Sequence, residues 1–289
     1  MGLADWFTTF CSALTVKNRD DISVRYGNIT KRLNTDFWST TSETSHSWLV
    51  GSYGRGTAIN GSSDVDMVFE LPSALYFQYD KYTGNGQSAL LQAVRASIMT
   101  TYRTTGVGGD GQVTVARFSD GITFEVVPVF KCQDETYIFP NSNGGGSWRP
   151  TDPRPEIQAI RDRDVACNGN LRRLCRMMRA WKNKHAVPMG GLLIDTLAYQ
   201  FIGSWEYRDQ SYLYYDYMCR DFFKFMAGQD KAQTYWRAPG SEQQVRRTGI
   251  FQWKARKCYE MAVGAIKYEK QERMAKARWR VIFGTAFPN

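Results

Sequence analysis

Two aspartates that alternate along one apolar run are the residues of this sequence best suited to metal chemistry. Asp64 and Asp66 flank Val65, and the run continues through residues 67–69. In a β-strand, side chains two positions apart share a face, so both carboxylates point one way and Val65 points the other. Carboxylate oxygens are the ligands that hard divalent cations such as Mg²⁺ prefer. The alternation therefore predicts a divalent-cation site at the open edge of a strand.

A glycine-rich turn lies shortly before the two aspartates. Gly51 and Ser52 follow the apolar residues 48–50. Glycine lets the backbone approach a ligand closely, and a helix that begins after it points free N–H groups at an anion. The Ser52 hydroxyl adds a donor, and Arg55 adds positive charge. An isolated Asp-x-Asp is usually only a solvated strand edge, but a strand, a Gly-Ser turn and an Asp-bearing strand together predict a site for a nucleoside triphosphate bound to Mg²⁺.

A third acid lies in another apolar segment. Residues 112–118 and 122–130 predict two strands joined by a hairpin turn, and Glu125 stands in the middle of the second. On pattern alone it is an exposed acid on a half-buried strand. A third carboxylate beside Asp64 and Asp66 would instead complete a two-metal site.

The remaining pattern predicts the elements around these motifs. Apolar residues at helical spacing predict helices over 20–38 and 87–103. Residues 73–85 have the composition of a polar loop, and residues 105–111, with four glycines, that of a turn. A basic segment over 242–280 predicts one last helix.

These motifs together resemble those of a known enzyme family. The run from Gly51 to Thr57, Gly-Ser-Tyr-Gly-Arg-Gly-Thr, followed by Asp64-Val65-Asp66, resembles the signature of the DNA polymerase β-like nucleotidyltransferases. More narrowly, it is similar to that of the cGAS/DncV-like nucleotidyltransferases (CD-NTases). The run 124–128 resembles the family's third-acid strand, in which Asp is usual where Glu125 stands here. Residues 279–288 resemble the tail of many CD-NTases.

The resemblance implies an α+β, bilobed polymerase β-like fold. It has a mixed sheet in the catalytic lobe, a helical second lobe and a long N-terminal helix. Residues 1–150 would form the catalytic lobe with the N-terminal helices, and residues 151–289 the helical lobe that closes the nucleotide cleft. The segment 140–155, rich in Gly, Asn, Ser and Pro, would be a long active-site loop or the lobe boundary.

The resemblance also implies a reaction. The enzyme would join nucleoside triphosphates, ATP or others, into a cyclic or short linear oligonucleotide second messenger with release of pyrophosphate, in bacterial antiphage (CBASS) signalling. Asp64, Asp66 and Glu125 would be the catalytic residues and would hold two Mg²⁺ or Mn²⁺ ions. The partners implied are a regulator protein or activating nucleic acid, and a downstream effector that binds the product.

Other residues would then contact the nucleotide. Gly51, Ser52 and Arg55 would do so from the glycine-rich turn. A basic residue on a second-lobe helix touches the triphosphate in this family, and its position, commonly Lys, is occupied here by Arg179, with Lys182 as the alternative. Asp195 resembles an acid that has a structural role on the following helix.

Composition sets limits on the class of protein. The 289 residues are 43% hydrophobic and carry a formal charge of +9, as expected of a folded protein that binds anions. Six cysteines without Cys-x-x-Cys spacing and two histidines do not predict a zinc site. No apolar run approaches the roughly 18 residues of a membrane span, and no secretory signal is evident. We therefore expect a cytoplasmic protein without a membrane partner.

Two alternatives remain open from the sequence. One is a template-independent nucleotidyltransferase that acts on RNA ends, which the basic C-terminal segment favours. The other is a nucleic-acid-binding module without catalysis on a decayed scaffold, against which the three carboxylates argue.

Overall fold

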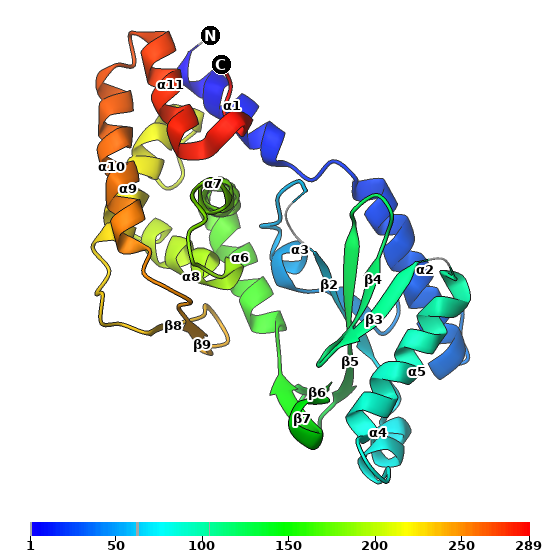
Figure 1. The fold of residues 1–289 in the computed structure, drawn as a ribbon. Coiled ribbons are helices and arrows are strands. Elements are labelled where there is room, and N and C mark those ends of the chain that lie inside the picture. The colour runs from blue at the N-terminus through cyan, green and yellow to red at the C-terminus, as the bar shows by residue number, and fades with distance from the viewer. Residues whose placement is uncertain (1, 62–63, 104) are drawn as a thin grey trace. The chain divides into compact units, whose positions relative to one another are not determined.

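The computed structural model describes residues 2–61, 64–103 and 105–289, and their contacts divide the chain into two compact units (Figure 1). We call Lys17–Gly54 with Gly61–Pro153 the sheet unit. Met1–Val16, Arg55–Asn60 and Arg154–Asn289 form the helical unit. Among the described residues no helix is long and apolar enough to cross a membrane.

The sheet unit is built on a mixed sheet whose strands run in the order β1-β2-β5-β4-β3, with β6 paired to β5 and β7 to β6. Strands β2 and β5 are parallel, and the other neighbours are antiparallel. The bounds are β1 Ser47–Leu49, β2 Val65–Glu70, β3 Gly106–Asp110, β4 Val113–Arg117, β5 Thr123–Lys131, β6 Tyr137–Asn141 and β7 Ser147–Thr151.

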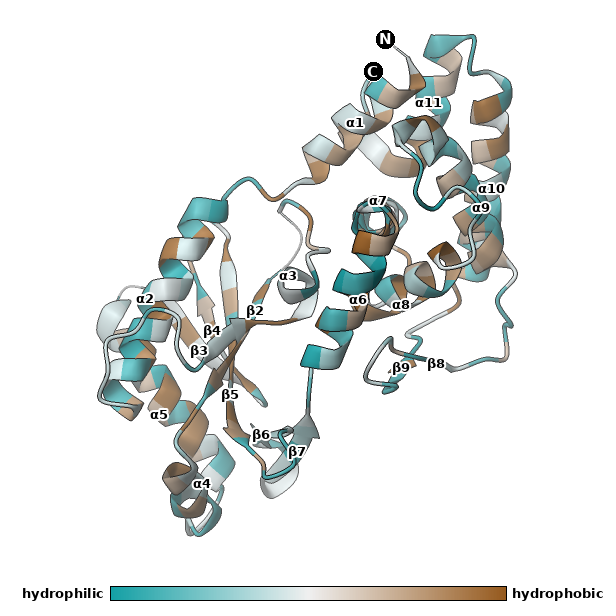
Figure 2. Cartoon of the chain, turned by 180° about the vertical axis from the view of Figure 1, so that it is seen from behind, coloured by the Kyte–Doolittle hydropathy of each residue, from teal (hydrophilic) through white to brown (hydrophobic). Residues whose placement is uncertain are grey.

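Helices cover this sheet. They are α2 Arg19–Phe37, α3 Gly51–Arg55, α4 Ser73–Asp80 and α5 Gly86–Thr101, with a 3₁₀ turn at Asn143–Gly145. Helix α2 buries Ile22, Ile29 and Leu33 at helical spacing and packs on α5 and β2. In Figure 2, α2 and α5 each carry hydrophobic and hydrophilic residues in alternation, as amphipathic helices packed on a sheet do. The α+β class and the long N-terminal helix predicted from the sequence are confirmed.

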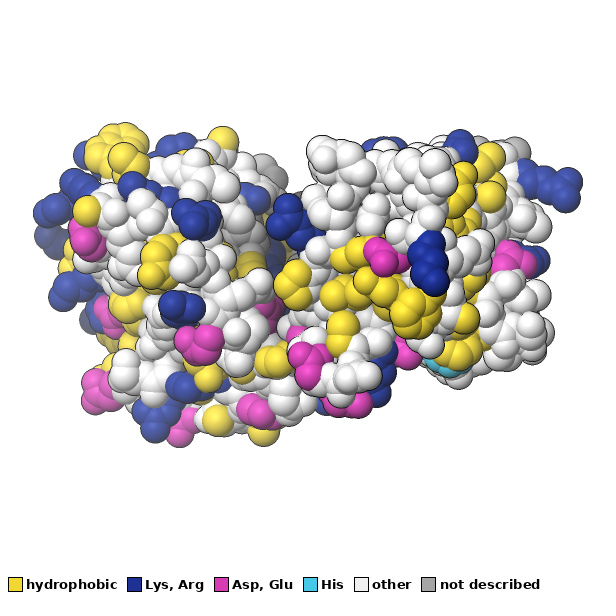
Figure 3. All heavy atoms as spheres, turned by 90° about the horizontal axis from the view of Figure 1, so that it is seen from below, with side chains coloured by type: hydrophobic (Ala, Val, Ile, Leu, Met, Phe, Trp, Pro, Cys, Tyr) yellow, Lys and Arg dark blue, Asp and Glu magenta, His cyan; other side chains and the backbone are white. Residues whose placement is uncertain are grey.

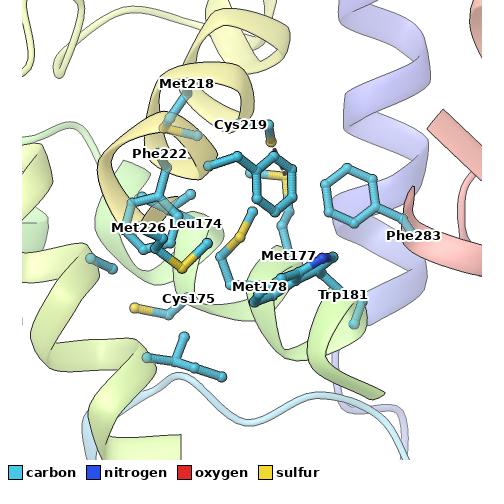
Figure 4. Packing of buried hydrophobic residues seen from close by; sticks show 14 of the residues in the cluster. Leu174, Cys175, Met177, Met178, Trp181, Met218, Cys219, Phe222, Met226 and Phe283 are labelled. Carbon is cyan, nitrogen blue, oxygen red and sulfur yellow. Dashed lines mark hydrogen bonds between the residues drawn. The ribbon is translucent and has the colours of Figure 1, made fainter. Parts of the chain in front are cut away.

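The helical unit contains the remaining elements. Its helices are α1 Leu3–Leu14, α6 Arg154–Ala166, α7 Asn170–His185, α8 Gly191–Ile202, α9 Tyr215–Ala227, α10 Gln252–Lys267 and α11 Glu272–Phe283, with 3₁₀ turns at Tyr212–Tyr214 and Gly284–Ala286. A small hairpin pairs β8 (Tyr235–Arg237) with β9 (Gln244–Arg246). Figure 4 shows the centre of its core, where Trp181 and Leu174 of α7 lie among side chains of α9 and Phe283 of α11.

Three local predictions were wrong. The stretch 73–85 is not all loop, because α4 packs on the sheet: Tyr76 lies 5.6 Å from Phe130 between ring centroids. The stretch 105–111 contains strand β3, whose backbone pairs with β4 in register despite its glycines. The segment 242–280 forms two helices rather than one, since α10 ends at Lys267 and α11 begins at Glu272.

The two units differ in surface character on the face that Figure 3 shows. Figure 3 shows Lys and Arg side chains scattered over the helical unit and a hydrophobic patch on the sheet unit. Exposed aromatic residues of the sheet unit near α4 include Phe77, 58% exposed, and Tyr82, 53% exposed. On the face that Figure 3 shows, the basic side chains of the helical unit are dispersed and do not form one patch.

The two units differ from the predicted lobes 1–150 and 151–289. The segments Met1–Val16 and Arg55–Asn60 belong to the helical unit, whereas the prediction placed them in the catalytic lobe. Helix α1 packs in the core of the helical unit because its aromatic residues are fully buried there. Phe7 meets Trp279 and Phe287 edge-on, each at 5.3 Å between ring centroids. The C-terminal run 279–288 is therefore part of the core that α1 completes.

Replacing Phe7 by Ala should destabilise the helical unit by about 3–5 kcal/mol, since it empties a fully buried aromatic site. Urea denaturation followed by tryptophan fluorescence measures the change. Val24→Ala, at a position 62% exposed on α2, is the control and should shift the free energy of unfolding by less than about 0.5 kcal/mol. Equal effects of the two substitutions would contradict the packing described.

Candidate active site

The parallel pairing of β2 with β5 brings two of the predicted acids together. Asp66 is the register partner of Glu125, and residues paired in this way point to the same face of the sheet. Their backbones are about 4.8 Å apart, the ordinary strand spacing. Val65 and Phe124, one position earlier on each strand, are almost fully buried on the other face, whereas the two acids are only partly buried. The sheet thus presents a pair of carboxylates on its less buried face.

The third acid and a tyrosine lie next to this pair. Asp64 is exposed and stands directly before β2 begins at Val65. The pKa of the Tyr53 hydroxyl is raised by partial burial and then by the negative charges of Asp64 and Asp66. Both carboxylates therefore act electrostatically on Tyr53, a residue that sequence reasoning did not single out. Its one signal was its place inside the glycine-rich motif.

The donor set suits a hard cation. Asp64, Asp66 and Glu125 offer only carboxylate oxygens, which fit Mg²⁺ or Mn²⁺ and not a metal that prefers sulfur or imidazole. Within the residues that the structure describes, no three His, Cys, Asp or Glu side chains already form a metal cluster. What the fold supplies is the Asp66–Glu125 pair from strand register, with Asp64 at the start of the same strand.

Gly51 allows the backbone to pass close to Asp66. It begins α3 with a φ of +57°, and a Cβ added there would overlap the Asp66 carboxylate. The neighbouring Val50 N–H donates to the Asp66 carbonyl oxygen at 2.9 Å, which fixes the approach. Ser52 follows in the first turn of α3. The Gly-Ser pair is therefore held directly beside one of the carboxylates.

Replacing Gly51 by Ala should destabilise the protein more than replacing Gly61 by Ala. Both glycines have positive φ, +57° and +71°, so both substitutions impose the left-handed backbone cost. A Cβ at Gly61 meets nothing within 4 Å, whereas one at Gly51 collides with Asp66. We expect about 1–3 kcal/mol of additional destabilisation for Gly51→Ala, measured by denaturant unfolding. Indistinguishable values would show that the close approach is absent.

The next residues of the motif belong to the helical unit and form a buried ion-pair network. Arg55 Nε lies 2.9 Å from Asp195 Oδ2, and the Thr57 hydroxyl donates to the same oxygen at 2.9 Å. Arg179 pairs with both Asp195 oxygens, at 2.5 and 2.9 Å. Burial by itself raises the pKa of the Asp195 carboxyl, but the charges of Arg179 and Arg55 outweigh it and lower the pKa to about 2.

Backbone contacts attach the same segment to the helices. Arg172 Nε donates to the Arg55 carbonyl oxygen and Arg176 to that of Gly56, each at 2.8 Å. The Asn60 N–H donates to the Leu14 carbonyl oxygen of α1 at 3.0 Å. The stretch Arg55–Asn60 is therefore anchored in the helical unit.

The three predicted basic contacts thus have different surroundings. Arg55 and Arg179 are buried, at 6% and 5% exposure, and share Asp195. Lys182 is partly exposed one turn further along α7, and its ammonium group has no acceptor or acid partner among the residues that the structure describes. Asp195, fully buried between the two arginines, has the structural role that the sequence indicated.

Replacing Asp195 by Asn should cost about 3–5 kcal/mol at pH 7, because it removes the counter-charge of the buried Arg179 and leaves the buried Arg55 only its longer contact with Glu156, at 3.8 Å. The folded pKa of about 2 lies below the ordinary 3.8, so the pair stabilises the fold fully above about pH 4 and loses this contribution as the pH falls towards 2. The difference from wild type should therefore shrink in acid. Denaturant unfolding at several pH values tests this.

Asp209→Asn, at an exposed site of the same unit, is the control and should change stability little at any pH. A wild-type to Asp195→Asn difference that stayed constant from pH 7 to pH 2 would contradict the ion-pair assignment.

Comparison with known proteins gives a family match and several structural relatives. The family described as the Second Messenger Oligonucleotide or Dinucleotide Synthetase domain (SMODS) matches residues 1–164, more than half of the chain. A probable cyclic nucleotide synthase of Bacillus cereus (strain VD146) is 24% identical over 279 residues, covering 83% of this chain and 81% of the relative.

Two solved structures have the same fold. CdnC of E. coli MS115-1, determined with ATP, matches with a TM-score of 0.68 at 14% identity and covers 99% of each chain. A variant of the Vibrio cholerae di-nucleotide cyclase DncV matches with a TM-score of 0.68 at 13% identity, over 84% of this chain and 70% of DncV. The predicted polymerase β-like architecture is thereby confirmed.

Proposed function

Because this chain belongs to the Second Messenger Oligonucleotide or Dinucleotide Synthetase family, among the cGAS/DncV-like nucleotidyltransferases, we propose that it joins nucleoside triphosphates into a cyclic or short linear oligonucleotide and releases pyrophosphate. The family and the nucleotidyltransferase class predicted from the sequence are confirmed. The product class follows the B. cereus relative, a probable cyclic nucleotide synthase.

The observation that carries the proposal is the pairing of Asp66 with Glu125 beside Gly51 and Ser52. Nucleotidyl transfer needs little covalent chemistry from a protein and depends on alignment and charge neutralisation. A pair of acids on one sheet face can hold divalent cations, which would supply the charge neutralisation, and the backbone turn held against one acid can contribute to alignment. A histidine base is not required in this mechanism.

The carboxylates of Asp64, Asp66 and Glu125 would hold two Mg²⁺ or Mn²⁺ ions. Bound there, the ions would neutralise the triphosphate and lower the pKa of the attacking ribose hydroxyl. Glu125 reaches one methylene further than the Asp usual in the family, so it can hold an ion from the neighbouring strand. The Tyr53 hydroxyl keeps its proton at neutral pH, as a tyrosine ordinarily does, and burial and then the two aspartates raise its pKa further, so it is a hydrogen-bond donor there.

The triphosphate would be oriented by the α3 backbone at Gly51, the Ser52 hydroxyl and a cation. Of the basic contacts predicted from the sequence, Lys182 is the one whose ammonium group has no partner among the described residues, so it can bind a phosphate without giving up a contact of the fold. Arg55 and Arg179 remain predicted contacts, but each would have to exchange the Asp195 carboxylate for a phosphate.

The partners proposed follow the structural relatives. CdnC has been determined with ATP and in complex with a HORMA protein, and DncV with GTP. We propose ATP and GTP as the first substrates to test here, and a regulator protein or nucleic acid as activator. An effector that binds the product, in a cytoplasmic antiphage (CBASS) pathway, completes the proposal.

Asp66→Asn and Glu125→Gln should each lower product formation about 10³-fold or more, because charge stabilisation worth several kcal/mol is lost at the reacting phosphate. Radiolabelled nucleoside triphosphates are incubated with Mg²⁺ or Mn²⁺ and treated with phosphatase, and resistant products are identified by mass spectrometry. Asp21→Asn, at an exposed acid on α2, is the matched control and should keep full activity. A folded Asp66→Asn protein that still makes the wild-type product would refute the site.

The same assay separates the alternatives. If wild type makes no product, duplex DNA is added as activator and then an RNA oligonucleotide as acceptor. Extension of the RNA end would establish the RNA-end nucleotidyltransferase. Nucleic-acid binding without any nucleotide transfer would establish the non-catalytic module.

A further inference from the structure

A basic cavity lies wholly within the helical unit, between the end of α7, helix α11 and the residue Asn289. Its volume is about 650 Å³, within the range of small-molecule sites. Four cationic side chains line it: Lys184, Arg273, Lys276 and Arg280. None of them belongs to the carboxylate site of the sheet unit, and the proposed reaction uses none of them.

Most of this positive charge is not neutralised. Lys276 pairs with Glu272 at 2.6 Å and also donates to the Asn289 oxygen at 2.7 Å, so its charge is engaged within the fold. Arg280 donates to the Phe287 carbonyl oxygen at 2.8 Å, a neutral acceptor that leaves its charge in place. The exposed side chains of Lys184 and Arg273 have no acceptor among the described residues. Three cations of the cavity therefore lack an acid.

Helix α11 arranges these cations on one face. Arg273, Lys276 and Arg280 are separated by three and then four positions, so they lie on one stripe that spans about 10 Å along the axis. Ala277 lies within the stripe and leaves room above the helix. The opposite face is fixed in the core by Trp279 and other buried residues, so the orientation of the stripe is determined by packing.

The negative end of the α7 dipole does not repel an anion in this cavity. The last carbonyl groups of α7, at His185 and Ala186, accept from the Lys254 ammonium group, which offsets the negative end of the helix. The pKa of His185 is lowered by burial and, among smaller effects, by the charges of Lys184 and Lys254. The cavity therefore combines concave shape with positive charge from two helices, an arrangement that concentrates anions.

We propose that this cavity binds a small molecule bearing two or more linked phosphates, such as an oligophosphate or a nucleotide. A single phosphate cannot bridge cations spread over about 10 Å of helix, whereas a chain of phosphates can contact Lys184, Arg273 and Arg280 together. Arginine favours phosphate because its planar group donates two parallel hydrogen bonds. The concave form selects a compact ligand over an extended nucleic acid backbone.

The test is calorimetric binding of inorganic tripolyphosphate and, separately, of ATP, in EDTA so that no metal–phosphate complex forms at the carboxylates. The variant is Lys184→Gln with Arg273→Gln. Both side chains are exposed and without partners in the described part of the chain, so thermal unfolding should match wild type. We expect at least about a tenfold loss of affinity, and weaker binding of wild type at higher salt.

The matched control is Arg256→Gln with Lys267→Gln, which removes the same charge from exposed sites on α10. It should bind like wild type. Tighter binding of ATP than of tripolyphosphate would identify a nucleotide ligand, and equal or weaker binding an inorganic one. Absence of tripolyphosphate and ATP binding, or equal affinity in both double variants, would overturn the proposal. Duplex DNA and a hexaglutamate peptide are titrated in the same way. If the Lys184→Gln, Arg273→Gln variant lost affinity only for one of these two, the partner would be a macromolecule and the proposal would be overturned.

Discussion

The parallel pairing of β2 with β5 determines what the sheet unit can do chemically. It makes Glu125 the neighbour of Asp66, although the two lie far apart in the sequence. A shift of one residue would exchange Glu125 with Phe124 or Val126, both fully buried, and would place the acid in the core. The burial of these apolar side chains therefore holds the two carboxylates together. The core of the sheet and the candidate active site depend on the same register.

A second constraint divides the glycine-rich motif between the two units. Residues up to Gly54 fold with the sheet, whereas Arg55–Asn60 fold with the helices. Asp195 explains why Arg55–Asn60 fold with the helices, because a buried carboxylate is tolerated only when cations and hydrogen-bond donors surround it. Arg55, Arg179 and Thr57 fill that role. One short motif thus contributes both to a candidate nucleotide site and to the polar centre of a helical core.

The arginines and lysines of the helical unit fall into two groups. Arg55, Arg172, Arg176 and Arg179 donate to buried carboxylate or carbonyl oxygens and hold segments of the fold together. Lys184 and Arg273, exposed and without an acceptor among the described residues, line a cavity together with Arg280, which itself donates to the Phe287 carbonyl oxygen. Several of the 37 lysines and arginines are therefore engaged in the fold and not available for ligands. Burial and partners, not composition, separate structural cations from binding ones.

The sequence by itself determined the acids, the Gly-Ser turn and helix α2, because alternation, helical spacing and turn chemistry depend on residues close together in the chain. The α+β class followed from the resemblance of these motifs to those of a known family. Only the tertiary structure decided that Asp66 faces Glu125, that Arg179 meets Asp195, and that the glycine-rich stretch 106–110 forms a strand. Strand register and ion-pair partners depend on residues far apart in sequence. An arginine has the same local pattern whether its guanidinium group meets a phosphate or a buried carboxylate.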